Sequence, residues 1–318
     1  MKPLPKVSVI IPNYNHAAFL ERRINTVLHQ TYSNIEVIIL DDCSSDNSRG
    51  IISQYRQHPK VAKIILNETN SGSPFAQWKK GLDYASGDWI WIAESDDYAD
   101  FNFLEKLVGK SMEAPSSGLI YSDSIAIDND GVIIENFVFS MLKNANLKTN
   151  HWSNDYDNVG LLEIEDYLLN GGTINNTSAV IFKKDVLIAA NIFDKRFRYI
   201  GDKYAFIKVL SISNISYINQ PLNYYRINPH DTSLVKHELR YCYEHFVVFD
   251  SILNQQIPIS KKKFYTAFYN NLQLSFYKNW SIGKLKVFMS MFEINPVLFY
   301  RFMLFNLTNP IIVRFFGK

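Results

Sequence analysis

The stretch VSVIIPNYN, residues 7–15, is an apolar run of strand-forming side chains that ends at Pro12 and is followed by polar residues. Residues 17–30 then place apolar side chains at the spacing of one helix face. A strand, a loop and a helix in this order begin a βαβ unit. The stretch therefore predicts an α/β fold built on a parallel sheet.

The same alternation continues through the first hundred residues. Strands are expected at residues 35–40, 61–66 and 89–93, and helices at about 44–57 and 75–85. Repeated units of this kind predict a Rossmann-like domain with a mostly parallel central sheet.

Polar clusters follow three of these strands, at residues 13–15, 41–46 and 94–97. In an open parallel sheet the carboxyl ends of the strands meet at one edge, and ligands bind in the crevice beyond them. The sequence therefore predicts one cleft that collects side chains from positions far apart in the chain.

The acidic cluster Glu94-Ser95-Asp96-Asp97 ends the strand expected at residues 89–93. Adjacent carboxylates at a strand end can hold Mg²⁺ or Mn²⁺, which prefer oxygen ligands, and leave positions open for phosphate oxygens. The alternative is a solvated turn whose acids cap the helix expected at residues 101–109. Spacing alone leaves both interpretations open.

The middle of the chain has a less regular pattern. Residues 119–139 are expected to form two strands around the Asn-Asp-Gly turn at 129–131, and residues 152–160 a polar, aromatic loop. A short strand at 179–182 and a short helix at 184–190 follow.

A further helix is expected at residues 203–212, just after Gly201 and Asp202. A carboxylate at this point has two explanations, because acids at a helix start also stabilise the free N–H groups and the helix dipole. From the pattern alone, Asp202 is either a helix cap or a functional acid.

After about residue 234 the sequence is helical in pattern and rich in Phe, Tyr, Lys and Arg. Such aromatic and basic side chains are typical of helices that lie on an anionic membrane surface. The alternative is a helical subdomain whose aromatic side chains pack on the preceding domain. Charges and prolines interrupt every apolar run before the ~20 residues that a membrane-spanning helix needs.

The composition limits the partners and the compartment. A formal net charge of +2 is too small to indicate nucleic-acid binding, so no such partner is expected. The two cysteines, Cys43 and Cys242, lie far apart and form no CxxC pair. Since the first residues also lack a signal-peptide pattern, a cytoplasmic protein is expected.

Several motifs, in order, resemble the family 2 glycosyltransferases. They are VSVIIPNYN (residues 7–15), QTYSNIEVIILDDCSSD (30–46) and ASGDWI (85–90), which leads to ESDD (94–97). The resemblance is strong over residues 6–125 and weaker over 179–235. It implies a GT-A fold, a nucleotide-sugar donor and inversion at the anomeric carbon.

The resemblance also assigns the nucleobase site. It places Pro12, Asn13, Tyr14 and Asn15 around the base, which is usually uracil, and Asp41 against it. A carboxylate is a suitable acceptor for the imide N–H of uracil.

The donor sugar and phosphates are expected near a helix whose sequence departs from the family. Relatives have Ala-Arg-Asn before a helix glycine, whereas this sequence has Gln77-Trp78-Lys79 before Gly81. Trp78 and Lys79 are therefore expected to contact the donor in a different way.

The resemblance makes residues 94–97 the DXD element of the family. Asp96 is then expected to face the ribose or the metal, and Asp97 to bind the metal. Glu94 stands where many relatives have Asp. The expected cofactor is Mn²⁺ or Mg²⁺, because a divalent cation stabilises the charge of a departing diphosphate.

Residues 193–202 resemble the family segment that ends in Glu-Asp, whose Asp is the catalytic base. Gly201 replaces the Glu, and Asp202 keeps the Asp. Asp202 is expected to take the proton of an acceptor hydroxyl as its oxygen attacks the anomeric carbon opposite the leaving nucleotide. His230, which with Arg226 resembles the family's late basic motif, is expected beside the metal or the diphosphate.

The expected domains follow from these assignments. Residues 1–233 would form a GT-A catalytic domain, with a nucleotide-binding half at about 1–125 and an acceptor-binding half at about 126–233. Residues 234–318 would form a helical C-terminal region, which either contacts the membrane or packs on that domain.

The expected function is transfer of a hexose or N-acetylhexosamine from a nucleotide sugar, with UDP favoured. The acceptor would be a glycan or lipid-linked intermediate of bacterial surface polysaccharide synthesis at the inner face of the cell membrane. A homologue that binds nucleotide sugar or glycan without turnover is the alternative, because Glu94 and Gly201 depart from the family pattern. A nucleotidyltransferase or dehydrogenase is disfavoured, since no glycine-rich loop follows the first strand.

Overall fold

The computed structural model describes residues 4–136, 149–171, 174, 176–227, 237–272 and 282–305. The chain divides into two compact units. The first comprises Met1–Ile164 and Gly171–Pro229, and the second comprises Glu165–Asn170 and His230–Lys318. The expected boundary at residue 233 lies outside the described residues.

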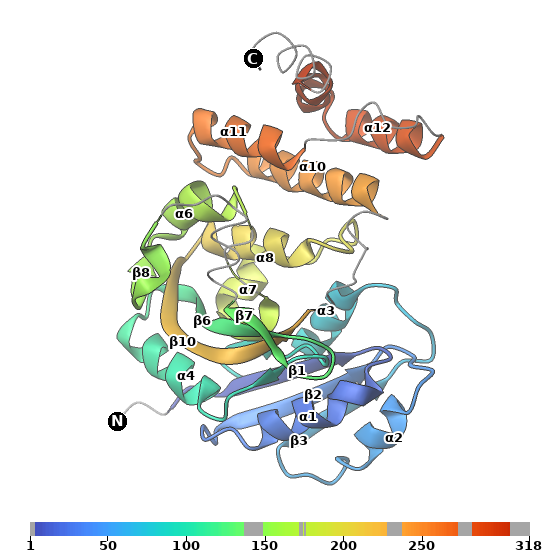
Figure 1. The fold of residues 1–318 in the computed structure, drawn as a ribbon, viewed down its shortest axis with the longest axis vertical. Helices are drawn as coiled ribbons and strands as arrows, with labels where there is room; N and C mark the ends of the chain where they lie inside the picture. Colours follow the sequence, from blue (N-terminus) through green and yellow to red (C-terminus); the bar gives the residue numbers. More distant parts are fainter. Residues whose placement is uncertain are drawn as a thin grey trace. The chain divides into compact units, whose positions relative to one another are not determined.

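A ten-stranded sheet runs through the described part of the first unit (Figure 1). Its order is β3-β2-β1-β4-β9-β6-β10-β5, with β7 beside β6 and β8 beside β10. The strands are β1 (Val7–Asn13), β2 (Ile35–Asp41), β3 (Val61–Leu66), β4 (Trp89–Ile92), β5 (Tyr98–Ala99), β6 (Ser117–Ile127), β7 (Ile133–Asn136), β8 (Tyr156–Asn158), β9 (Val180–Lys183) and β10 (Asn214–Arg226).

The strand directions confirm the predicted α/β fold with a mostly parallel central sheet. β3, β2, β1 and β4 are parallel neighbours, and β6 and β10 are also parallel. β9 runs antiparallel between β4 and β6 and joins the two parallel parts.

Helices cover both faces of this sheet. They are α1 (Ala17–Leu28), α2 (Ser48–Ser53), α3 (Pro74–Tyr84), α4 (Phe103–Glu113), α6 (Gly160–Glu163), α7 (Lys184–Ala190) and α8 (Gly201–Leu210). Short 3₁₀ segments lie at His151–Ser153 and Thr177–Ala179, and a π-helical segment at Ile164–Leu168.

Side-chain alternation along β1 decides which helices lie on which face. Val9 and Ile11 belong to a buried cluster that also holds apolar side chains of α1, α2 and α4. Ile10 points to the other face, where α3 packs so closely that a Cβ on Gly81 would lie 2.4 Å from the Ile10 side chain. Both faces are buried, as expected for a parallel sheet.

Several local expectations were wrong. β1 does not end at Pro12 but continues to Asn13, which pairs with Asp41 of β2. The 152–160 loop contains β8, which pairs with β10. β10 itself was not predicted, because Pro221 interrupts its strand pattern; the structure places this residue beside irregularities in the β6 pairing, where a strand tolerates proline.

The second unit is helical in its described part, as predicted. Its helices are α10 (Glu238–Asn254), α11 (Lys261–Asn271), α12 (Ile282–Ile294) and residues 296–305. The Phe249 ring meets Phe264 and Phe268 edge-on, at centroid distances of 5.3 and 5.4 Å. Among the described helices, none has the length and apolar character needed to cross a membrane.

Two helix glycines give a matched test of the close packing of α3 on β1. A Cβ on Gly81 would clash with the buried, β-branched Ile10, whereas nothing lies within 4 Å of one on Gly109 of α4. Gly81→Ala should lower the free energy of unfolding by about 1–3 kcal/mol through overpacking. Gly109→Ala should raise it by roughly 0.5–1 kcal/mol, because alanine favours a helix interior. Urea unfolding followed by tryptophan fluorescence measures both, and equal shifts would contradict the packing argument.

Candidate donor site

A cavity of about 380 Å³ opens at the carboxyl ends of β1, β2 and β4. Its wall comes from five parts of the first unit, since the loops after parallel strands meet at this edge. The lining includes Pro12 and Asn13 at the end of β1 with Tyr14 after it, Asp42 after β2, Gln77 of α3, Glu94 and Ser95 after β4, and Arg198 and Tyr199 before α8. The cavity thus brings together part of each of the three predicted polar clusters.

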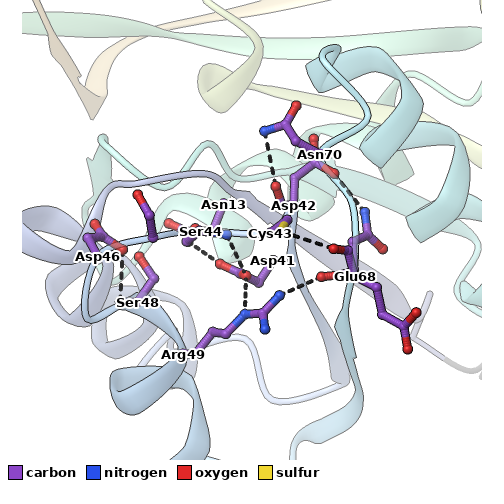
Figure 2. Close-up of polar contacts among 12 residues, drawn as sticks. Asn13, Asp41, Asp42, Cys43, Ser44, Asp46, Ser48, Arg49, Glu68 and Asn70 are labelled. Atoms are coloured by element: carbon purple, nitrogen blue, oxygen red, sulfur yellow. Dashed lines mark hydrogen bonds and ion pairs between the residues drawn. The ribbon is translucent and has the colours of Figure 1, made fainter.

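Asp41 is buried beside this cavity and does not line it. Its Oδ1 accepts a hydrogen bond from Asn13 Nδ2 at 2.9 Å, and its Oδ2 accepts from the Ser44 N–H and from Arg49 Nε, each at 3.0 Å (Figure 2). These contacts engage both oxygens. Asp41 therefore braces the loop after β2.

Asp42 is the carboxylate of this pair that borders the cavity. It accepts hydrogen bonds from Asn67 Nδ2 at 2.7 Å, from Gln77 Nε2 at 2.8 Å, and from the N–H and hydroxyl of Ser71 at 3.0 and 2.7 Å. It therefore connects the loop after β3 to α3. Sequence reasoning selected Asp41 and missed Asp42, although strand alternation separates two adjacent acids onto different sides.

The residues at the end of β1 and in the loop after it differ in whether they line the cavity. Tyr14 is exposed and lines the cavity. Asn15 has a left-handed backbone, with φ of 56°, and its side chain accepts the Ser45 N–H at 2.8 Å. It shapes the loop and is absent from the cavity wall. Asn13 Oδ1 is buried and accepts no hydrogen bond within the described residues, which leaves one acceptor available at the wall.

Glu94 is held in place by three contacts from three elements. Its Oε1 accepts from Trp78 Nε1 of α3 at 2.8 Å, its carbonyl accepts from Arg23 Nε of α1 at 2.8 Å, and its N–H donates to Ser178 Oγ at 3.1 Å. Trp78 is buried and does not line the cavity. Its effect on a ligand therefore passes through Glu94.

Asp96 and Asp97 differ in their surroundings. Asp97 is buried, with Oδ1 accepting from the Arg226 N–H at 2.9 Å and Oδ2 from Asn176 Nδ2 at 2.8 Å. The carboxylate of Asp96 is partly exposed and accepts no hydrogen bond within the described part of the chain. Arg226 also donates through Nε to the Asp96 carbonyl at 2.8 Å, so it braces this element.

The guanidinium of Arg23 lies fully buried beneath the acidic cluster. Its NH2 is 3.9 Å from Asp97 Oδ2, and among the described residues neither NH1 nor NH2 has a hydrogen-bond partner. Burial lowers the pKa of Arg23 to about 10, at which the side chain is still charged at pH 7. It therefore acts as a fixed internal cation for the carboxylates above it.

This one cation does not fully compensate the cluster. Burial, and then the charge of Asp96, raise the pKa of Glu94 to about 8 and that of Asp97 to about 7. Within the described residues, no group of three or more His, Cys, Asp or Glu side chains is arranged to hold a metal. The carboxylate of Asp96 nevertheless supplies oxygen atoms, which are the ligands that a hard cation prefers. It accepts no hydrogen bond within the described residues, whereas both oxygens of the neighbouring Asp97 do.

Asp202 lies in the first turn of α8, where its Oδ1 accepts the Lys203 N–H at 2.7 Å. It is close in sequence to the cavity-lining Arg198 and Tyr199 but does not itself line the cavity. A Cβ on Gly201 would lie 2.5 Å from the Phe75 ring of α3. This contact explains why a glycine occupies the position that is Glu in the family pattern.

Two expected contacts lie elsewhere. Lys79 is exposed on α3, pairs with Asp83 at 3.6 Å and does not line the cavity. His230 lies outside the described residues. Sequence reasoning missed Gln77, Arg198 and Tyr199, because only the folded arrangement of α3 and the segment before α8 places them at this cavity.

Comparison with known proteins agrees with this arrangement. The family model of glycosyl transferase family 2 matches residues 8–158, which contain β1 through β5 and the acidic cluster. Residues 8–158 are therefore similar to the family 2 glycosyltransferases.

Two curated relatives show the extent of the similarity. TuaG of Bacillus subtilis, named for teichuronic acid biosynthesis, is 34% identical over 42% of this chain and 52% of its own length. The GalNAc(5)-diNAcBac-PP-undecaprenol beta-1,3-glucosyltransferase of Campylobacter jejuni is 31% identical over 35% of this chain and 36% of its own length. The chain thus spans about a third to a half of the length of these relatives.

A solved structure shares the fold over a longer range. Residues 1–349 of S. aureus TarS superpose with a TM-score of 0.68 at 18% identity, covering 96% of this chain and 88% of that one. The same TarS fragment has been solved in complex with UDP-GlcNAc, with a TM-score of 0.67 at 17% identity over 96% of this chain and 89% of that one.

The pKa values predict how stability depends on pH without a divalent cation. A carboxyl whose folded pKa lies above its unfolded value binds more protons when folded, so its stabilisation is lost as pH rises through the folded pKa. For Glu94 this loss falls between pH 4.5 and about 8. Glu94→Gln keeps an acceptor for Trp78 and should be more stable than the parent at pH 8, on the order of 1–3 kcal/mol.

The difference between Glu94→Gln and the parent should vanish towards pH 4.5. Urea unfolding at several pH values in the presence of EDTA measures it. A difference that stays constant across this range would show that Glu94 does not titrate in this way.

Proposed function

We propose that this protein transfers a hexose or N-acetylhexosamine from a nucleoside diphosphate sugar to a glycan or lipid-linked acceptor, with inversion at the anomeric carbon. The observation that carries the proposal is the cavity at the ends of β1, β2 and β4, which has carboxylates on one wall and polar loop residues on the other. A UDP-sugar is favoured because the TarS fragment has been solved with UDP-GlcNAc.

The nucleobase is placed beside Pro12, Asn13, Tyr14 and Asp42. The exposed Tyr14 offers a ring face for stacking. Asn13 Oδ1 accepts no hydrogen bond within the described residues and offers an acceptor for the N–H group of the base. Asp42 lines the same cavity whereas Asp41 does not, so the proposed set holds Asp42 in place of Asp41.

The diphosphate and a divalent cation, Mn²⁺ or Mg²⁺, are placed at Asp96 and Asp97. The residues fit such an ion, because the Asp96 carboxylate accepts no hydrogen bond within the described residues and lies beside Asp97, whose pKa is raised by burial and then by the charge of Asp96. When bound, the ion would stabilise the departing nucleoside diphosphate. His230 remains a proposed contact that no described atom tests.

Asp202 is proposed as the general base. It would accept the proton of the acceptor hydroxyl while that oxygen forms a bond to the anomeric carbon and the bond from that carbon to the diphosphate oxygen breaks. Its place in the first turn of α8, just after the cavity-lining Tyr199, supports this role. The Phe75 contact with Gly201 fixes the start of this helix.

The proposed setting is bacterial surface polysaccharide synthesis at the inner face of the cell membrane. The names of TuaG and of the Campylobacter glucosyltransferase refer to teichuronic acid and to an undecaprenol-linked glycan. A homologue that binds without turnover is the second candidate, because both oxygens of Asp97 already accept protein hydrogen bonds.

Nucleotide binding separates these proposals. The protein is titrated by calorimetry with UDP-, GDP- and dTDP-sugars, each with and without Mn²⁺. We expect tight binding of one class only with the metal, and a loss of at least tenfold in Asp96→Asn. Asp96 is a cleaner target than Asp97, whose removal would leave the buried Arg23 unpaired.

Lys79→Ala serves as the control, since its side chain lies outside the cavity, and it should bind as the parent does. Binding that is independent of metal and of Asp96 would remove the proposed diphosphate site.

The rate of donor hydrolysis tests the proposed role of Asp202 as the general base. With water as acceptor, Asp202→Asn should bind the donor normally and hydrolyse it about 10²–10⁴-fold more slowly. Donor binding without hydrolysis in the parent and in the variant would favour the non-catalytic candidate.

A further inference from the structure

The last two described helices of the second unit pack together through phenylalanine rings. Phe288 of α12 lies 6.1 Å from Phe299 and 5.7 Å from Phe302, between ring centroids. Met291 and Leu298 are also buried. These contacts give each helix one apolar face that is already covered.

Both helices carry a second apolar face that is exposed. On α12, Leu285, Met289 and Phe292 follow the i, i+4, i+7 spacing, and each is more than half exposed, at 54, 54 and 53%. Residues 296–305 carry Val297, Tyr300 and Leu304 at the i, i+3, i+7 spacing of one helix face, and these side chains are 69, 68 and 50% exposed. These six residues form the apolar stripe. A helix with one solvated side is expected to be polar there, and clustered exposed apolar side chains mark an interaction surface.

A basic cavity adjoins the apolar stripe. It has a volume of about 390 Å³ and lies between α10 and α12, with His237, Arg240, Tyr243, Lys286 and Ser290 in its wall. Lys286 directly follows Leu285 of the stripe. Its ammonium group has no hydrogen bond or ion pair within the described residues, so the cavity can accept an anion.

We infer that the apolar stripe and the basic cavity together bind the surface of a bilayer that contains anionic phospholipid. The stripe would enter the boundary between headgroups and acyl chains, and Lys286 would face lipid phosphates. This helix pair lies along the membrane surface, since none of the described helices can span it. The inference extends the proposed function, because a lipid-linked acceptor would reside in the same surface.

A second copy of the chain fits the surface less well. A symmetric dimer places the same patch on both partners. Each copy would then bring to the interface a Lys286 that has no ion-pair partner within the described residues, and like charges oppose such an interface. An anionic surface complements both the charge and the apolar character.

Vesicle co-sedimentation of the full chain tests the inference. The probes are vesicles of phosphatidylcholine alone and vesicles with about one third phosphatidylglycerol. The parent should bind the anionic vesicles, and the combined variant Leu285→Ser, Met289→Ser and Phe292→Ser should lose at least about tenfold in partitioning, since burial of one such side chain is worth that much. Lys286→Gln should lose mainly the salt-sensitive part of the binding.

A combined Ile188→Ser and Ile212→Ser variant is the matched control, because both side chains are 55% exposed in the first unit. It should bind vesicles as the parent does. No vesicle binding by the parent, or equal losses in the stripe and control variants, would overturn the inference. A parent that dimerises without vesicles, and a stripe variant that is monomeric, would assign the stripe to a second copy.

UDP-sugar binding is measured in the same samples. Intact nucleotide binding without vesicle binding would remove only the membrane surface. Vesicle binding without nucleotide binding would remove only the proposed function.

Discussion

The buried Arg23 guanidinium is the constraint on which the donor site depends. Within the described part of the chain its NH1 and NH2 have no hydrogen-bond partner, and such a charge is costly inside a protein. It is tolerated because the carboxylates of Glu94, Asp96 and Asp97 stand above it, and all three raise its pKa against the effect of burial. The positive charge of Arg23 also reduces the repulsion among the three acidic side chains that follow β4.

The charges of the site consequently depend on one another, because the Arg23 cation and the carboxylates of Glu94, Asp96 and Asp97 interact. One fixed cation faces up to three carboxylates, and burial, followed by the charge of Asp96, raises the pKa of both Glu94 and Asp97. A divalent cation beside Asp96 would add positive charge to this cluster, which links the charge of these carboxylates to the proposed cofactor. Arg226 supports the same element through backbone contacts, so its role is to position the acids.

The sequence predicted the sheet and the edge that carries the site, because strand and helix periodicities in residues 7–97 are strong and local. It did not predict β10, because the proline and polar residues of this long strand interrupt the apolar alternation that indicates a strand. It also did not distinguish Asp41 from Asp42, or show that Lys79 lies outside the cavity while Gln77 lines it. Those distinctions depend on side-chain direction and on contacts between distant segments, such as Trp78 with Glu94 and Phe75 with Gly201.

The most direct test of the central claim is a crystal structure with UDP and Mn²⁺, using data collected at the manganese absorption edge. The account predicts an anomalous peak beside the Asp96 carboxylate, with the uracil ring between Tyr14 and Asp42. UDP bound at another surface, or manganese bound without contact to Asp96 or Asp97, would contradict it.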